Sequence, residues 1–286
     1  MDATGPEPGI AGTRLAVDSH AHVFCGDLPF APGRVYTPEP CQAGTARQFR
    51  AVLDAHGITH GLLVGAQPYD TDNRCLLRSI AQSGGRFRGI ALVPAGATPR
   101  ELRDLADGGV VGIRINLTTD GMRGLVEPGA ERLLAQVREM GWFVQVHCEH
   151  DELAEAAPIL RRAGVRAMID HLGRPHAARG TAQPGFRALL ELGREGTAVC
   201  KVSGPFRSSV EGHPWRDVDP FVEAVLEAFT PDRCVWGSDW PFVRMDERVD
   251  YGPALAWLRR VVPDEARREK LLWSTPARLF GVASPA

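Results

Sequence analysis

The strongest constraint on the fold is a regular alternation of short, β-branched runs with amphipathic helical patterns. Such runs are typical of strands buried on both faces, as in parallel sheets that helices cover. The chain has 286 residues, and eight of these runs are spread over most of it. They are residues 15–24, 59–66, 87–93, 110–116, 142–148, 166–172, 197–204 and 233–240.

Glycines follow the helical patterns between the runs, where a residue that readily takes a left-handed conformation ends a helix. They are Gly57, Gly109, Gly141, Gly164 and Gly196. Eight strand–helix units predict an α/β protein with a single-domain (β/α)8 TIM barrel. A doubly wound open sheet is the competing fold, but it would usually show a glycine-rich first turn, and the sequence has none.

Two segments follow from this pattern, a disordered N-terminal lead over residues 1–13 and the barrel over residues 14–286. The lead lacks the basic and apolar parts of a signal peptide, and no apolar run approaches the roughly 20 residues of a membrane helix. We therefore expect a cytoplasmic location and no membrane partner. The formal net charge of -2 gives no reason to expect nucleic acid as a partner. The sequence leaves homo-oligomeric assembly open.

The six cysteines are scattered, without any pair spaced C-x-x-C. In a chain of this length, such a pattern favours reduced, mostly buried thiols over a disulfide framework or a structural zinc site.

Polar side chains stand at the C-terminal ends of four of the expected strands. In a TIM barrel these ends meet at one rim, where the active site lies. A lone strand histidine is more often a hydrogen-bonded core residue, but an alternating pair directs both rings to one face. The side chains expected to converge are His20, His22, His147, His171 and Asp239.

Two further polar residues lie inside the expected strands. Asp170 precedes His171 and should therefore point to the opposite face, as a structural partner. Lys201 is either an inward salt-bridge partner, which we favour slightly, or a substrate contact. The remaining histidines fall on expected helices or loops, and we assign them no function: His56, His60, His150, His176 and His213.

The ordered set D-S-H-A-H, V-H, D-H and G-S-D-W, at the ends of the first, fifth, sixth and eighth runs, resembles the amidohydrolase superfamily, amidohydrolase 2 type. Within it the chain looks most like the 2-pyrone-4,6-dicarboxylate lactonase group. The closer likeness is carried by RVYTP (34–38), DTDNRCLL (70–77), GIRINL (112–117), DHLGRP (170–175), KVSGPFR (201–207) and WGSDWPF (236–242).

The resemblance implies hydrolysis of a lactone ring, in aromatic compound catabolism, without an obligatory metal. Asp239 would activate water, while His20, His22 and His171 would polarise the carbonyl. Arginine forks match carboxylates bidentately. The resemblance places Arg114, Arg174 and Arg207 against the carboxylates of an anionic small-molecule substrate. Tyr36 and His147 are further candidate substrate contacts.

Two departures from the group's pattern matter. His147 stands where the group carries an aromatic hydroxyl residue, and Arg123 is the candidate replacement for a second arginine, with Asp120 nearby. The first departure reopens the question of a metal, since three or four N/O ligands suit one Zn²⁺ or Mn²⁺. The shell would be His20, His22, His147 and Asp239. No lysine ends the fourth run to carry a bridging carbamate, so a binuclear centre is not expected.

The leading hypothesis is therefore a hydrolase acting on the ester bond of a small, carboxylated lactone. The main alternative is a metal-dependent decarboxylase of the same superfamily, with His171 as its acid/base. An anion-binding barrel without turnover is the third reading, and it is opposed by the expected convergence of a base with electrophiles.

Overall fold

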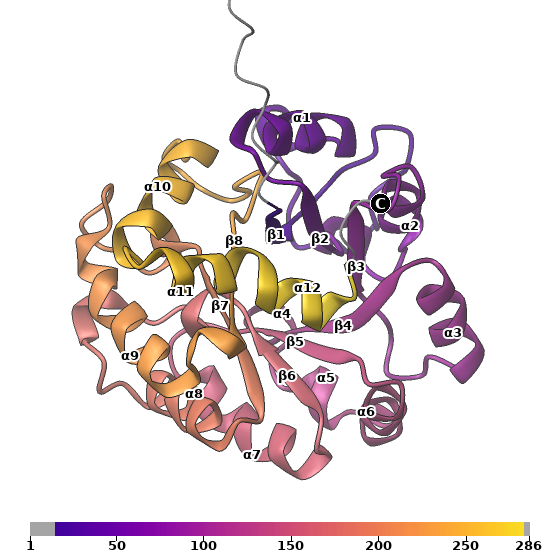
Figure 1. Ribbon diagram of the computed structural model, residues 1–286. Coiled ribbons are helices and arrows are strands. Elements are labelled where there is room, and N and C mark those ends of the chain that lie inside the picture. Colours follow the sequence, from indigo (N-terminus) through magenta and orange to yellow (C-terminus); the bar gives the residue numbers. More distant parts are fainter. Residues whose placement is uncertain (1–14, 283–286) are drawn as a thin grey trace, which may run out of the picture.

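Eight parallel strands form one sheet in chain order in the computed structural model, which describes residues 15–282 (Figure 1). Two backbone hydrogen bonds between β1 and the chain after β8 close the sheet: the Asp239 amide donates to the His20 carbonyl oxygen, and the His22 amide donates to the Trp240 carbonyl oxygen. The predicted barrel is thereby confirmed. The strands are β1 (Val17–Ala21), β2 (His60–Val64), β3 (Phe87–Ala91), β4 (Val110–Asn116), β5 (Phe143–His147), β6 (Arg166–Ile169), β7 (Ala198–Ser203) and β8 (Cys234–Gly237).

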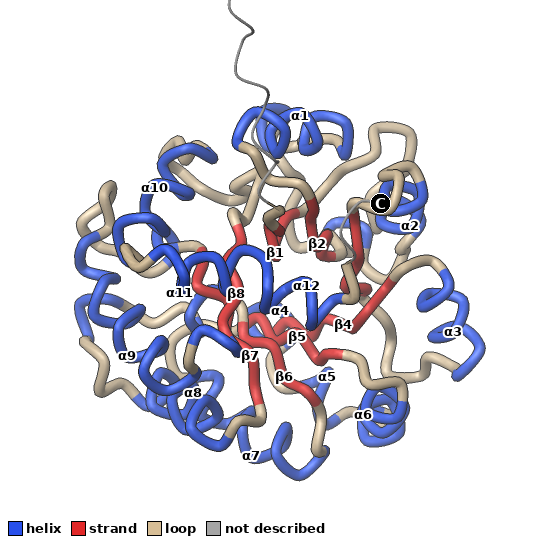
Figure 2. Tube along the Cα trace, in the orientation of Figure 1, coloured by secondary structure: helices blue, strands red, loops and turns tan. Residues whose placement is uncertain are grey.

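Helices surround the sheet, as the alternating pattern predicts (Figure 2). The helix after β1 shows how the sequence sets helix ends. Thr45 and Gln48 form a reciprocal capping box at its start, and Gly57 ends it with a φ of 71°. The helices are α1 (Ala46–His56), α2 (Arg74–Ala81), α3 (Pro99–Asp107), α4 (Leu117–Asp120), α5 (Arg123–Val126), α6 (Ala130–Glu139), α7 (Glu152–Ala163), α8 (Pro184–Glu195), α9 (Asp219–Phe229), α10 (Tyr251–Val261), α11 (Glu265–Glu269) and α12 (Thr275–Phe280).

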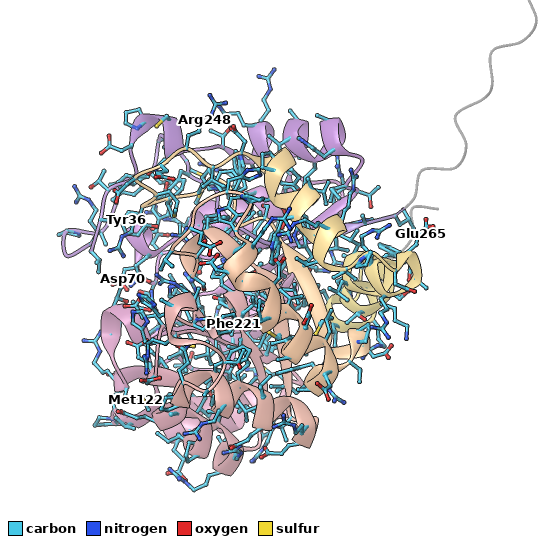
Figure 3. All side chains as sticks on the ribbon, turned by 90° about the vertical axis from the view of Figure 1, so that its left-hand side faces the viewer. Tyr36, Asp70, Met122, Phe221, Arg248 and Glu265 are labelled. Atoms are coloured by element: carbon cyan, nitrogen blue, oxygen red, sulfur yellow. A yellow bond between two sulfur atoms is a disulfide. The ribbon has the colours of Figure 1, made fainter. Side chains whose placement is uncertain are left out.

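The two ends of the barrel differ in chemistry. At one end, Leu279 and Phe280 of α12 pack with apolar strand residues such as Val17 and Phe143 in one buried cluster. Figure 1 shows α11 and α12 lying across this end. Figure 3 places Tyr36 at the opposite end of the molecule from Glu265 of α11. The open end is therefore the one where the βα loops gather.

The structure corrects the expectation for the cysteines. Cys25, in the loop after β1, and Cys75, in α2, form a disulfide with a Cα–Cα distance of 5.8 Å. The two cysteines are 50 residues apart in the sequence, so no local motif predicts this disulfide; the fold brings them together. Cys148, Cys200 and Cys234 are buried free thiols, while Cys41 is an exposed one.

The N-terminal lead predicted over residues 1–13 lies outside the described residues, as do both ends of the range 14–286. Among the residues described, no helix is long and apolar enough to span a membrane.

Candidate active site

A cavity of about 190 Å³ opens at the C-terminal ends of the strands. Its lining combines histidines and an aspartate with several arginines, which are the residue types that the sequence predicts at this end of the barrel. His20 does not line the cavity, because it is fully buried behind this surface. The other predicted site residues all do: His22, Tyr36, Arg114, His147, His171, Arg174, Arg207 and Asp239.

Backbone contacts between β1 and the turn after β8 place the carboxylate beside the histidine pair. The Asp239 amide donates to the His20 carbonyl oxygen at 2.8 Å. Gly237 permits this approach, since a Cβ there would lie 2.6 Å from the His20 Cβ. Asp239 has a φ of 64°, a left-handed conformation that aspartate adopts more readily than most residues.

Three imidazoles surround one oxygen of Asp239. We call these four residues, His20, His22, His171 and Asp239, the floor of the cavity; His20 forms its buried underside. The Nε2 atoms of His20 and His171 lie 3.7 Å from Asp239 Oδ1, and that of His22 lies 4.0 Å from it. A group placed between them would meet a carboxylate and imidazole nitrogens together.

Arg207 holds the second oxygen of Asp239. Its Nε donates to Asp239 Oδ2 at 2.6 Å, and its Nη2 donates to the Val243 carbonyl oxygen at 3.0 Å. Burial alone would raise the pKa of Asp239, but Arg207 and the neighbouring imidazoles outweigh it and hold the pKa well below its usual range. Asp239 is therefore ionised across the physiological range.

The histidines near Asp239 are neutral at the same pH. Burial is the main cause, because a low dielectric disfavours the charged ring. It lowers the pKa to about 3 for His20, His22, His147 and His171.

The side of the cavity, which we call the wall, is formed by Arg114, His147, Glu149 and Arg174. Arg174 donates to His147 Nε2 at 3.2 Å and pairs with Glu149 at 3.0 Å. The Nε atoms of Arg114 and Arg174 are buried without a hydrogen-bond partner in the described part of the chain. Such orphaned donors suit a carboxylated ligand.

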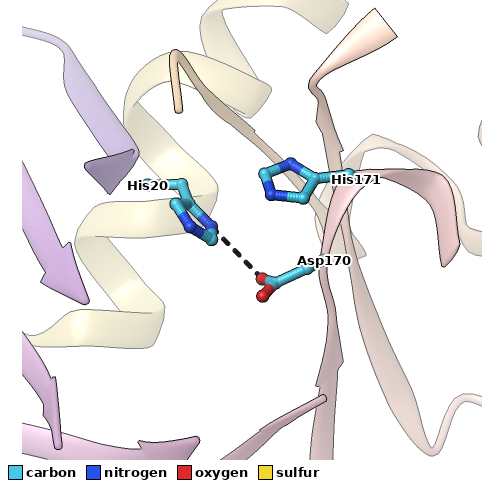
Figure 4. Close-up of side chains that lie close together, drawn as sticks. All are labelled: His20, Asp170 and His171. Atoms are coloured by element: carbon cyan, nitrogen blue, oxygen red, sulfur yellow. Dashed lines mark ion pairs between the residues drawn. The ribbon is translucent and has the colours of Figure 1, made fainter. Parts of the chain in front are cut away.

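A second polar layer lies behind the floor. Asp170 Oδ1 is 3.2 Å from His20 Nδ1 and 3.3 Å from Lys201 Nζ (Figure 4). Gln145 joins them, donating to Asp170 Oδ2 at 3.0 Å and accepting from Lys201 Nζ at 2.7 Å. Lys201 is thus the inward salt-bridge partner that the sequence slightly favours.

The expectation that Asp170 and His171 point to opposite faces is wrong. Atoms of both lie within 4.8 Å of each other and of His20. The reason is that β6 ends at Ile169, and His171 follows with a φ of 50°, so strand alternation no longer applies.

Several lining residues were not anticipated from the sequence. Neutral polar groups come from the segment after β2, from the end of β4 and from α4. A further cation, Arg244, lies over the Tyr36 ring, 5.6 Å from its centroid. Arg123 does not line the cavity; it pairs with Asp120 at 3.4 Å. Asn116 could have been predicted from the sequence, because it is a polar residue at the C-terminal end of β4. The unanticipated set is Gln67, Asn116, Thr118, Thr119, Glu149, Val243 and Arg244.

Two groups of described side chains have ligand atoms close enough to share a metal ion: His20, His22 and Asp239, and His20, Asp170 and His171. His147 belongs to neither group. The lone pair of His147 Nε2 accepts a hydrogen bond from the Arg174 guanidinium, so it is not free to bind a metal cation.

The chain belongs to the amidohydrolase family, whose model, described as Amidohydrolase, matches residues 17–282. Among curated relatives, the 2-pyrone-4,6-dicarboxylate hydrolase of Comamonas testosteroni is 34% identical over 93% of this chain and 90% of that protein. The 4-sulfomuconolactone hydrolase of Rhizobium radiobacter is also 34% identical, over 97% of this chain and 95% of that protein.

A solved structure from Acinetobacter baumannii, named as a 2-pyrone-4,6-dicarboxylic acid hydrolase with citric acid bound, is similar as well. It has a TM-score of 0.84 and 30% identity, and the match covers 93% of this chain and 99% of that one. The resemblance of the strand-end residues to the amidohydrolases is thereby confirmed.

Proposed function

We propose that this protein is a lactonase, which hydrolyses the ester bond of a small, carboxylated lactone. The observation that carries the proposal is the floor, where Asp239 Oδ1 lies within 4.0 Å of three imidazole Nε2 atoms beside a wall of arginines. The named activities of the relatives, both hydrolases of anionic ring compounds, support it.

Each residue of the floor has a chemical role in this proposal. Asp239 takes a proton from water, whose oxygen attacks the lactone carbonyl carbon. His171 and His22 line the cavity beside the position of the carbonyl oxygen, with His20 behind them. Charge develops on that oxygen in the tetrahedral intermediate. The ring C–O bond then breaks, and the proton held by Asp239 passes to the departing oxygen.

The wall binds the substrate's negative charge. Arg114 and Arg174 supply buried donors, Tyr36 and His147 flank them, and Arg207 is the third carboxylate partner that the resemblance implies. A substrate carboxylate that draws Arg207 away from Asp239 would raise the pKa of that carboxyl and make it a stronger base. The citric acid bound to the Acinetobacter relative supports an anionic ligand for this protein.

The sequence leaves open whether the site binds a single Zn²⁺ or Mn²⁺. His20, His22 and Asp239 have suitable donor types, but the four-residue shell does not fit, because His147 Nε2 accepts from Arg174. We therefore propose hydrolysis that does not require a metal. The decarboxylase alternative depends on that shell, and nothing in the geometry favours it. A cytoplasmic location and the state of assembly stay predictions.

The test follows the ultraviolet absorbance of 2-pyrone-4,6-dicarboxylate with purified protein, with and without a chelator. We expect loss of the pyrone signal at the same rate in both. Turnover that is abolished by the chelator and restored by one equivalent of zinc would contradict the metal-free part. Release of CO₂ in place of the ring-opened acid would replace the lactonase with the decarboxylase, and binding without product would leave only an anion-binding barrel.

A further inference from the structure

Lys201 occupies an unusual place for a lysine, in the middle of β7 inside the barrel. It is fully buried and does not line the cavity. Its ammonium has three polar neighbours: Gln145 Oε1 at 2.7 Å, His20 Nδ1 at 3.2 Å and Asp170 Oδ1 at 3.3 Å. Charge balance with Asp170 explains how the lysine is tolerated, but not why it contacts a histidine of the floor.

The contact with His20 restricts where that ring can carry its proton. An ammonium group has three donors and no acceptor, so a ring nitrogen that hydrogen-bonds to it must be unprotonated. Asp170 Oδ1 is an alternative partner at 3.2 Å from the same nitrogen. The two contacts of Nδ1 are of equal length, so the other ring nitrogen has to decide between them. If Lys201 is the partner of Nδ1, the proton of neutral His20 lies on Nε2.

His22 gives an independent argument for the same arrangement. Its Nδ1 lies 2.9 Å from the carbonyl oxygen of Val64, which can only accept, so Nδ1 carries the proton and Nε2 has the lone pair. His20 Nε2 and His22 Nε2 are 3.3 Å apart. A hydrogen bond between them requires one proton, and the contacts of Lys201 and Val64 place it on His20.

We propose that Lys201 is a positioning residue that fixes the proton of His20 on Nε2. His20 then enters the floor as a hydrogen-bond donor, and its Nε2 has no lone pair to offer a metal ion. The tautomer is a property of the free protein, while its value for catalysis rests on the proposed lactonase function. There, the substrate's carbonyl oxygen would replace His22 Nε2 as the acceptor of the His20 proton as negative charge develops on that oxygen.

The first test is carried out on the wild-type protein, labelled with ¹⁵N-histidine. Long-range ¹H–¹⁵N correlation spectra distinguish the two neutral tautomers, and spectra of His20→Asn and His22→Asn assign the two rings. We expect the Nε2–H form for His20 and the Nδ1–H form for His22. The Nδ1–H form at His20 would overturn the proposal, and this result does not depend on any substrate.

The second test compares Lys201→Met with Lys270→Met, which removes the only other lysine, a surface residue paired with Asp232. Without the ammonium, Asp170 is the remaining partner of His20 Nδ1. The ring should therefore change to the Nδ1–H form, and Zn²⁺ should bind at least tenfold more tightly in competition with a chromophoric chelator. Lys270→Met should change neither quantity. An unchanged tautomer in folded Lys201→Met protein would refute the role of Lys201.

Kinetics separate this proposal from the proposed function. For Lys201→Met we expect kcat to fall by roughly 10²-fold, the usual scale for one lost oxyanion donor, with KM within a few-fold of wild type. A wild-type protein that opens no lactone would refute the function and leave the tautomer result standing. Full kcat in the variant would refute the catalytic value of the tautomer. Loss of Lys201 removes one of the two cations beside the buried Asp170 and leaves only Arg114, at 3.4 Å. If the variant does not fold, the wild-type spectrum decides.

Discussion

The floor of the cavity is mostly histidine and half of the wall is arginine, and the two differ in how their polar atoms are used. In the floor, Nδ1 of each histidine has a partner: Lys201 for His20, Val64 for His22 and Ser203 for His171. In the wall, the Nε atoms of Arg114 and Arg174 have none among the residues described. In the proposed lactonase, the floor would therefore be preorganised for the reaction, while the wall would keep donors for the substrate.

This difference separates rate from affinity. A group fixed by buried partners stabilises a transition state without reorganisation, so changes in the floor should lower kcat. A group with spare donors stabilises bound substrate and transition state alike, so changes in the wall should mainly move KM.

Among the histidine and wall variants, the largest effect should come from His171→Asn in the floor. Asparagine tolerates the left-handed backbone at this position, where φ is 50°. We expect kcat to fall by roughly 10²- to 10³-fold, the scale for one lost oxyanion donor, with little change in melting temperature. His150→Asn is the matched control, since His150 has a φ of 52° and does not line the cavity. Equal losses in both variants would mean that the backbone, and not the imidazole, is responsible.

A smaller effect is expected from Arg174→Gln in the wall. A hydrogen bond to a charged group contributes about 1.5–3 kcal/mol, so KM for a carboxylated lactone should rise roughly tenfold or more, with kcat nearly unchanged. Arg179→Gln, which removes an exposed pair with Asp151 away from the cavity, should leave both constants as they are. A fall in kcat alone would assign Arg174 to the floor's chemistry.

The smallest effect, and one of opposite sign, is expected from Glu149→Gln. Glu149 competes with the substrate for Arg174, and partly exposed pairs are worth about 0.2–1 kcal/mol. KM for a carboxylated lactone should therefore fall by about two- to fivefold, and KM for an uncharged lactone should stay constant. A higher KM for both substrates would show that Glu149 orients Arg174.

Sequence patterns predict the barrel well because each strand is a local feature. β4 spans Val110–Asn116, the same residues as its β-branched run, and the other strands lie within theirs. The floor is predictable for a related reason, since the barrel rule brings strand ends to one rim. Its residues had only to be recognised as polar groups in otherwise apolar runs.

The contacts that assign roles are not local, and the sequence does not show them. Whether Lys201 pairs with Asp170, or Arg207 with Asp239, depends on how neighbouring strands and the loops after them are placed. The Cys25–Cys75 disulfide and the place of Glu149 beside Arg174 likewise follow from loop paths. His171 shows a limit of periodicity, since one residue with positive φ reverses the expected direction of a side chain.

The most direct test of the separation between floor and wall is a calorimetric titration of Asp239→Asn with the intact lactone. Loss of the general base should lower turnover by roughly 10²- to 10⁴-fold, which leaves the lactone unreacted during the titration. Because the wall is intact and Arg207 is released from Asp239, we predict a Kd no weaker than the wild-type KM. A folded variant that turns over at the wild-type rate, or one that no longer binds the lactone, would contradict the account.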